Sequence, residues 1–175
     1  MARRPIRSIP DPILRQTCEE VTIFDGELER LAEDMVETMY AAPGIGLAAP
    51  QVGIAKRLAV VDVSVGEEPD QLKILVNPRI SNPRGETSEL EGCLSIPELT
   101  DKVRRPAVIQ VDYQDLQGNA HTMEAEEWTA RAISHEVDHL DGILFVDHLR
   151  GLRRERMRRQ LKKLLRSLEQ DKVTA

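Results

Sequence analysis

Residues 133–142 read ISHEVDHLDG, and this stretch predicts the central element of the fold, a helix with two histidines. On a helix, His135 and His139 lie one turn apart on the same face, so both imidazoles can reach one metal ion. Glu136 follows the first histidine, where its carboxylate is placed to handle protons. A catalytic metal site needs three protein ligands and one open position, so a third ligand must come from elsewhere in the chain.

The stretch itself leaves the identity of the third ligand open. One group of zinc proteases continues the pattern with a further histidine, but the required position is Phe145 here, and His148 comes three residues too late. This argues against a zinc endopeptidase. The remaining candidates are His121, Cys18, Cys93 and distant carboxylates. The alternative is a helix whose two histidines bind no metal.

The composition is typical of one soluble globular domain: 175 residues, of which 41% are hydrophobic and 31% charged. No apolar run approaches the roughly 20 residues of a membrane span, and no apolar segment follows the N-terminal arginines as a secretory signal would require. Two cysteines are too few for a disulfide framework. We therefore expect a single domain over residues 1–175 in a reducing cytoplasm, where a free cysteine can serve as a thiolate.

Hydrophobic periodicity predicts an N-terminal amphipathic helix. Asp25 is placed to cap it, and its apolar residues recur at three-and-four spacing. These residues are Leu28, Leu31, Ala32, Met35, Val36, Met39 and Tyr40. The glycine-rich residues 44–53 (GIGLAAPQVG) then predict a shaped loop.

Strands and a second helix are expected after this loop. The predicted strands cover residues 58–63, 74–76, 108–113 and 121–125, and the last two flank a hairpin turn at 115–119. The helix that carries the two histidines is expected from about Glu127 to Gly142. These elements predict an α+β fold, with short antiparallel sheets around a central metal-binding helix.

The C-terminal segment is basic although the net charge of the chain is −6. Between Leu152 and Leu168 there are eight lysines and arginines and one glutamate. The same segment places Met157, Leu161, Leu164, Leu165 and Leu168 on one stripe, which predicts a long amphipathic helix over about residues 152–170. A polyanionic partner is one interpretation of its charge; a docked helix with a solvated basic face is the other.

Three motifs in order, GIGLAAPQ (44–51), EGCLSIP (91–97) and HEVDHLDG (135–142), resemble the signature motifs of the peptide deformylases. The resemblance covers nearly the whole chain. It implies that Cys93, His135 and His139 are the metal ligands, with a water in the fourth position. It also implies Fe²⁺ as the native metal in many members, with Zn²⁺ or Ni²⁺ able to substitute.

The activity implied by the resemblance is hydrolysis of the N-formyl group from the initiator methionine of nascent polypeptides, which releases formate. Glu136 would act as general base and acid. The side-chain amide of Gln51 and the backbone N–H of Leu94 would stabilise the oxyanion. Backbone near Ile45 and Gly46, and near Glu91 and Gly92, would pair with an extended substrate.

The spacing on the catalytic helix adds Trp128 and Ala132 to the face that carries the histidines, so we expect Trp128 to wall the methionine pocket. The ribosome is an expected partner through the basic C-terminal helix, whereas a membrane and DNA are not. Two other function classes stay open: a different metallohydrolase or endopeptidase that uses the same helix, and an inactive paralogue that binds N-termini or metal.

Overall fold

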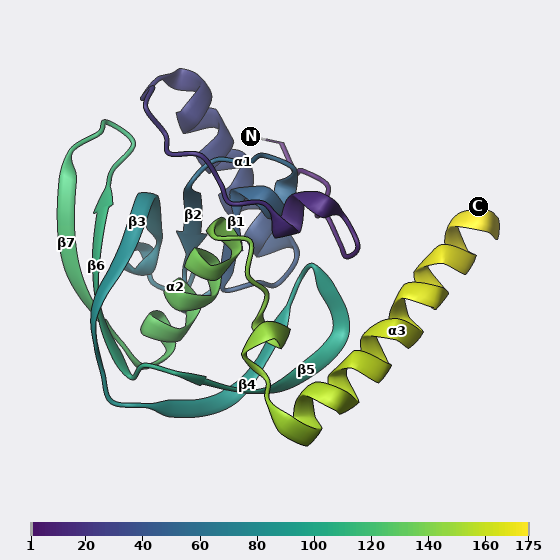
Figure 1. Ribbon diagram of the computed structural model, residues 1–175. Coiled ribbons are helices and arrows are strands. Elements are labelled where there is room, and N and C mark those ends of the chain that lie inside the picture. The colour runs from purple at the N-terminus through teal and green to yellow at the C-terminus, as the bar shows by residue number, and fades with distance from the viewer. Residues whose placement is uncertain (1, 175) are drawn as a thin grey trace.

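Helix α2 (Glu127–Leu140) crosses the middle of the computed structural model, which describes residues 2–174 (Figure 1). Its apolar residues face a sheet on one side, because Ala130, Ile133, Val137 and Leu140 recur at three-and-four spacing and are all buried. The two histidines occupy the same element, as the sequence predicts.

The sheet against α2 has five antiparallel strands in the order β1-β2-β3-β6-β7. Their bounds are Gly46–Ala48 (β1), Leu58–Val61 (β2), Lys73–Arg84 (β3), Val108–Gln114 (β6) and Ala120–Glu126 (β7). In β6, Ile109 and Val111 are buried, whereas Asp112 is exposed, so one side of this strand faces the core. All four residues of β2 are buried, because helices contact both faces of the sheet there.

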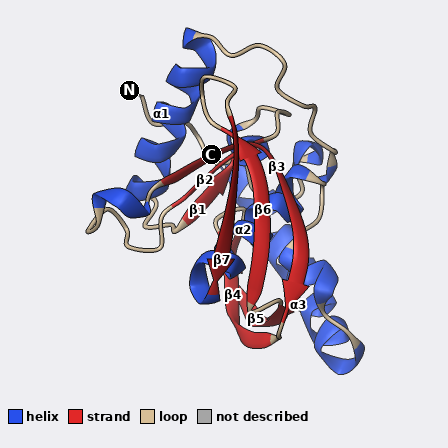
Figure 2. Ribbon diagram, turned by 90° about the vertical axis from the view of Figure 1, so that its left-hand side faces the viewer, coloured by secondary structure: helices blue, strands red, loops and turns tan. Residues whose placement is uncertain are grey.

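Helix α1 (Gly26–Ala41) covers the face of the sheet opposite α2, as the two views in Figures 1 and 2 show. Its N-cap is Asp25, whose carboxylate accepts hydrogen bonds from the N–H groups of Glu27 (3.0 Å) and Leu28 (3.1 Å). The N-cap residue and the apolar stripe of α1 both agree with the prediction from the sequence.

Strands β4 (Thr87–Cys93) and β5 (Ile96–Arg105) form a separate two-stranded sheet. Glu91 pairs with Asp101 in its register, and Cys93 ends the first strand. This hairpin lies across the end of α2 in Figure 1, and it brings Cys93 towards the helix. The sequence did not predict these two strands.

The last helix, α3 (Gly151–Thr174), begins against the body and then extends away from it (Figure 1). Met157 anchors its first half and is buried with Leu14, Ile96 and Phe145. The predicted amphipathic helix is therefore confirmed. Short 3₁₀ helices complete the elements: Pro12–Arg15, Ala49–Val52, Pro69–Gln71 and Phe145–His148.

The α+β class with short antiparallel sheets around a central helix is confirmed. The loop predicted over residues 44–53 is wrong at β1, where Gly46, Leu47 and Ala48 pair with β2 despite the glycine. Across the described residues, none of the helices is both long and apolar enough to cross a membrane.

Candidate metal centre and active site

Cys93, at the end of β4, meets two side chains of α2 that lie one turn apart, His135 and His139. The ligand atoms of Cys93, His135 and His139 all lie within 4.8 Å of one another, and Cys93 Sγ lies 3.2 Å from His139 Nε2. The other candidates for a third ligand lie elsewhere. His121 pairs with Asp115 at 2.9 Å, and Cys18 is buried in a small apolar cluster.

The donor set fits a divalent transition metal. A tetrahedral ion bound at about 2.3 Å by sulfur and about 2.0 Å by nitrogen holds these two atoms roughly 3.6 Å apart, close to the observed 3.2 Å between Cys93 and His139. Burial lowers the pKa of His139 well below its usual value, so this imidazole is neutral, as a ligand must be. Burial also disfavours a charged His135, but hydrogen bonds with Cys93 and Glu91 outweigh it and raise its pKa to about 10. Metal binding at His135 would therefore release a proton.

The carboxylate of Glu91 orients His135 from behind. Glu91 Oε2 lies 3.1 Å from His135 Nδ1, and Arg105 donates two hydrogen bonds to the same carboxylate, at 2.9 and 3.0 Å. Arg131 adds a third donor at 2.7 Å. Burial alone would raise the pKa of Glu91, but hydrogen bonds from His135 and Arg105 hold it well below its usual value. Glu91 is thus an ionised acceptor that fixes the imidazole.

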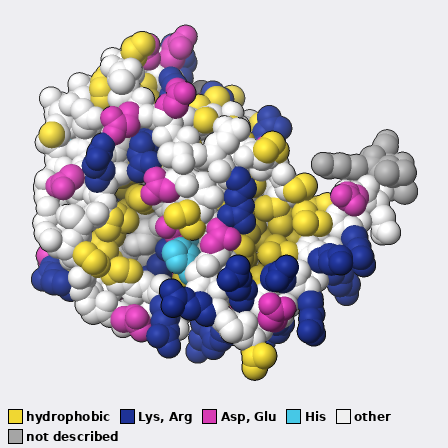
Figure 3. All heavy atoms as spheres, in the orientation of Figure 1, with side chains coloured by type: hydrophobic (Ala, Val, Ile, Leu, Met, Phe, Trp, Pro, Cys, Tyr) yellow, Lys and Arg dark blue, Asp and Glu magenta, His cyan; other side chains and the backbone are white. Residues whose placement is uncertain are grey.

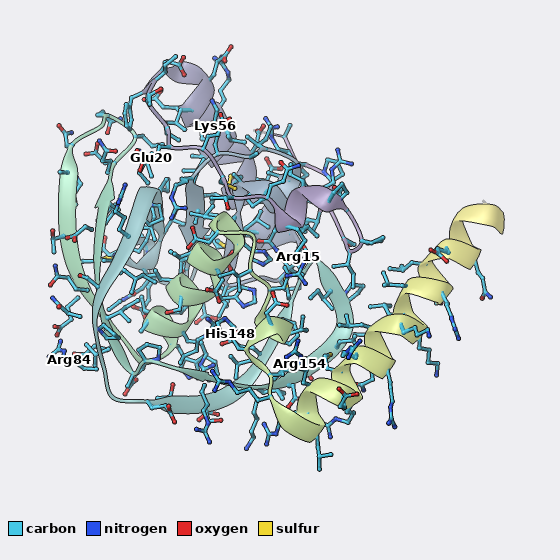
Figure 4. The ribbon with its side chains drawn as sticks, in the orientation of Figure 1. Arg15, Glu20, Lys56, Arg84, His148 and Arg154 are labelled. Atoms are coloured by element: carbon cyan, nitrogen blue, oxygen red, sulfur yellow. The ribbon has the colours of Figure 1, made fainter. Side chains whose placement is uncertain are left out.

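The neighbouring residues Arg104 and Arg105 have opposite environments. The side chain of Arg104 is exposed. Arg105 is buried, and it also donates to Asp138 at 2.5 Å. His148 contacts the same aspartate at 2.6 Å, and Figure 4 shows it just below α2.

Glu136 places a buried carboxylate next to His135 on α2. Its side chain is buried, and its Oε2 atom is among the few buried polar atoms of the described residues that lack a hydrogen-bond partner. Burial raises the pKa of Glu136 to about 7, which suits a group that accepts and returns a proton near neutrality. Gly46 makes room for it, because a Cβ atom at Gly46 would lie 2.3 Å from Glu136 Oε1.

Gln51 is held with its amide nitrogen towards the site. Its Oε1 accepts from the N–H of Ala48 at 2.9 Å, which leaves Nε2 as the donor to Ser95 Oγ at 3.2 Å. The same nitrogen lies 3.7 Å from Cys93 Sγ. A fixed donor therefore lies next to the candidate metal ligands.

A cavity of about 450 Å³ opens beside these groups. It is lined by every site residue predicted from the sequence except His139, the most buried of the three candidate ligands: Ile45, Gly46, Gln51, Glu91, Gly92, Cys93, Leu94, Trp128, Ala132, His135 and Glu136. Trp128 lies at its rim and is 51% exposed, so it is a wall residue rather than a core aromatic. Arg131 also lines the cavity and was missed, although its position four residues before His135 places both on one helix face.

Comparison with known proteins agrees with this geometry. The family described as Polypeptide deformylase matches residues 3–155. The peptide deformylase of Acidobacterium capsulatum is 47% identical over 169 residues, which cover 97% of this chain and 99% of that protein. The crystal structure of a peptide deformylase from Legionella pneumophila has a TM-score of 0.86 at 40% identity, and covers 96% of this chain and 98% of its own. That of the peptide deformylase from Thermus thermophilus has a TM-score of 0.87 at 41% identity, over 94% and 98% of the two chains. The chain belongs to the polypeptide deformylase family.

Proposed function

We propose that the cavity beside Cys93, His135 and His139 is where this chain carries out the activity of its family, removal of the N-formyl group from nascent polypeptides with release of formate. The observation that carries the assignment is the meeting of three metal donors with one buried carboxylate, Glu136. Residues 3–155 and α3, which shares its core through Met157, would form one domain.

A divalent cation, when bound, supplies a Lewis acid that polarises the formyl carbonyl and makes water nucleophilic at neutral pH. Cys93, His135 and His139 would hold it. Glu136 takes a proton from the attacking water at its free Oε2 and returns it to the departing amine. Gln51 Nε2 and the N–H of Leu94 donate to the oxygen on which negative charge develops.

An extended peptide would bind along the cavity. Backbone at Ile45 and Gly46 on one side, and at Glu91 and Gly92 on the other, offers strand-like pairing to it. The methionine side chain enters the apolar part, where Trp128 and Ala132 contribute from α2. Replacing Trp128 by alanine raises KM for formyl-Met peptides; an unchanged KM would remove it from the pocket.

The decisive experiment measures formate release from formyl-Met-Ala-Ser together with bound metal. Glu136→Ala lowers kcat by about 10²–10⁴ while metal binding persists, and the exposed Glu126→Ala serves as its control. Cleavage of internal peptide bonds without formate would support another metallohydrolase. Bound metal without turnover in the unaltered chain would support an inactive binding protein.

Fe²⁺ is the proposed native metal, with Zn²⁺ and Ni²⁺ able to replace it. One thiolate and two imidazoles accept all three ions, and the general affinity order favours Zn²⁺ over Fe²⁺. Iron is therefore tested by its redox chemistry. Activity that decays in air and is preserved by catalase or anaerobic handling identifies it, and activity indifferent to air excludes it.

The exposed basic side of α3 is proposed to contact ribosomal RNA in the cytoplasm, where nascent chains emerge. Figure 3 shows lysine and arginine side chains gathered along this helix and the adjoining edge of the body. Truncation before α3 would also remove the buried Met157, so charge reversal is the cleaner test. A variant with Arg154, Arg159 and Lys163 changed to glutamate loses salt-sensitive ribosome affinity and keeps peptide hydrolysis. If the variant still binds the ribosome with unchanged affinity, the proposed contact between α3 and ribosomal RNA is wrong.

A further inference from the structure

Trp128, Arg131 and His135 occupy successive turns on one face of α2. Arg131 is the middle member and is only 3% exposed. It lies between a residue at the mouth of the cavity and a metal ligand at its floor. Its own contacts extend in both directions.

Towards the floor, Arg131 shares an acceptor with the metal ligand. Its Nη1 donates to Glu91 Oε1 at 2.7 Å, while Glu91 Oε2 lies 3.1 Å from His135 Nδ1. One carboxylate on β4 thus joins two side chains that are one turn apart on α2. This contact leaves Nε2 of His135 as the nitrogen that can face a cation.

Towards the mouth, the guanidinium carbon of Arg131 lies 5.9 Å from the centroid of the Trp128 ring, within the range of a cation–π contact. The guanidinium is fixed by two further acceptors, the carbonyl of Val103 at 3.0 Å and Thr87 Oγ1 at 2.9 Å. A side chain held at three points on the β4–β5 hairpin presents an immobile face to the indole.

We propose that Arg131 is a positioning residue that ties the wall of the substrate cavity to metal ligand His135. It holds the carboxylate of Glu91 so that the imidazole keeps one orientation, and it holds the indole of Trp128 at the rim. The second half rests on the proposed role of Trp128 in the methionine pocket. Lysine cannot substitute, because a single ammonium lacks both the planar fork and the flat face that these contacts use.

The test uses metal-free protein and Co²⁺, with no peptide present. In Arg131→Lys and Arg131→Met, the Kd for Co²⁺, followed by thiolate-to-metal absorption, rises roughly 10-fold or more. Trp128 is the only tryptophan of the chain, so emission reports on it alone, and both variants change its wavelength or intensity before metal is added.

Two matched controls separate the halves of the proposal. Arg105→Lys disturbs Glu91 from another side, so it weakens Co²⁺ binding and leaves the emission of Trp128 unchanged. Arg104→Lys, exposed on the same strand, changes neither. Circular dichroism and thermal melting confirm that each variant is folded.

A folded Arg131→Lys protein with unaltered Kd overturns the proposal. Weakened metal binding with unchanged emission also overturns it, since Arg131 would then be an ordinary buried ion-pair partner. If both Arg131 variants fail to fold, Thr87→Val is tested instead, because it removes one hydrogen-bond acceptor of the guanidinium. Smaller changes in the Kd for Co²⁺ and in Trp128 emission support the proposal. If neither quantity changes, the proposal is overturned. Formate release by the unaltered enzyme is measured separately, so failure of the proposed function is distinguishable.

Discussion

At the scale of single residues, the tightest constraint is the approach of Gly46 to Glu136. Any side chain at Gly46 would collide with the carboxylate, since a Cβ atom there would lie 2.3 Å from Oε1. The proposed general base and the strand proposed to pair with substrate are therefore closely packed. A change at either one displaces the other.

We expect Gly46→Ala to lower kcat/KM roughly 100-fold, because displacing a catalytic group by about 1 Å has effects of that size. Gly26→Ala is the matched control, since its added Cβ meets only the end of the Arg30 side chain at 3.7 Å. Both variants are assayed by formate release after their fold is verified. Full activity in Gly46→Ala would show that Glu136 adjusts freely.

The buried thiol of Cys18 predicts a loss of stability at alkaline pH. Burial raises its pKa from 9.0 to about 11, so the folded chain keeps the proton where the unfolded chain loses it. This contribution is complete below pH 9.0 and disappears as the pH rises to about 11, with a magnitude of about 3 kcal/mol. Urea unfolding between pH 8 and 11 should show a flatter decline in Cys18→Ala; parallel curves would contradict the assignment.

At the scale of elements, the N-cap of α1 is a separable source of stability. Asp25→Ala removes the acceptor for two N–H groups and should lower the free energy of unfolding by about 1 kcal/mol. Asp25→Asn keeps an equivalent acceptor and should change it little. Thermal or urea unfolding measures both variants. Formate release at 25 °C should be unchanged, because Asp25 does not line the cavity.

The elements whose apolar residues recur with a clear helix or strand period were predictable from the sequence. Helices α1 and α2 and the β6–β7 hairpin follow simple apolar patterns, so their existence and approximate ends could be predicted from sequence. Strands β4 and β5 could not, because β4 exposes Leu90 and buries the charged Glu91. The partners Arg105, Arg131 and His135 make that burial favourable, and all three lie on other elements.

At the scale of the whole molecule, Met157 joins α3 to the core. Met157→Ala should lower the free energy of unfolding by about 2–4 kcal/mol, as expected when a fully buried methionine is truncated. Leu152→Ala, at a position 90% exposed on the same helix, should have almost no effect. Urea denaturation compares the two. Equal stabilities would mean that α3 is not part of the cooperative unit.

The relative placement of the motifs was the least predictable feature at this scale. Cys93 was one of several candidate ligands until its motif was considered with the other two, because sequence spacing alone says nothing about which segments meet. The β4–β5 hairpin brings it to His139, and the same hairpin carries Glu91 to His135. Ligand and orienting group therefore arrive on one element, which no local pattern indicates.

That division of the donors has a consequence during biosynthesis. Translation delivers the sulfur of Cys93 before the imidazoles of α2, so until then a growing chain holds only one member of the proposed donor set. Retention of the ion must await the docking of hairpin on helix near the end of synthesis. We therefore expect the supply of metals at that moment to influence which ion the finished protein keeps.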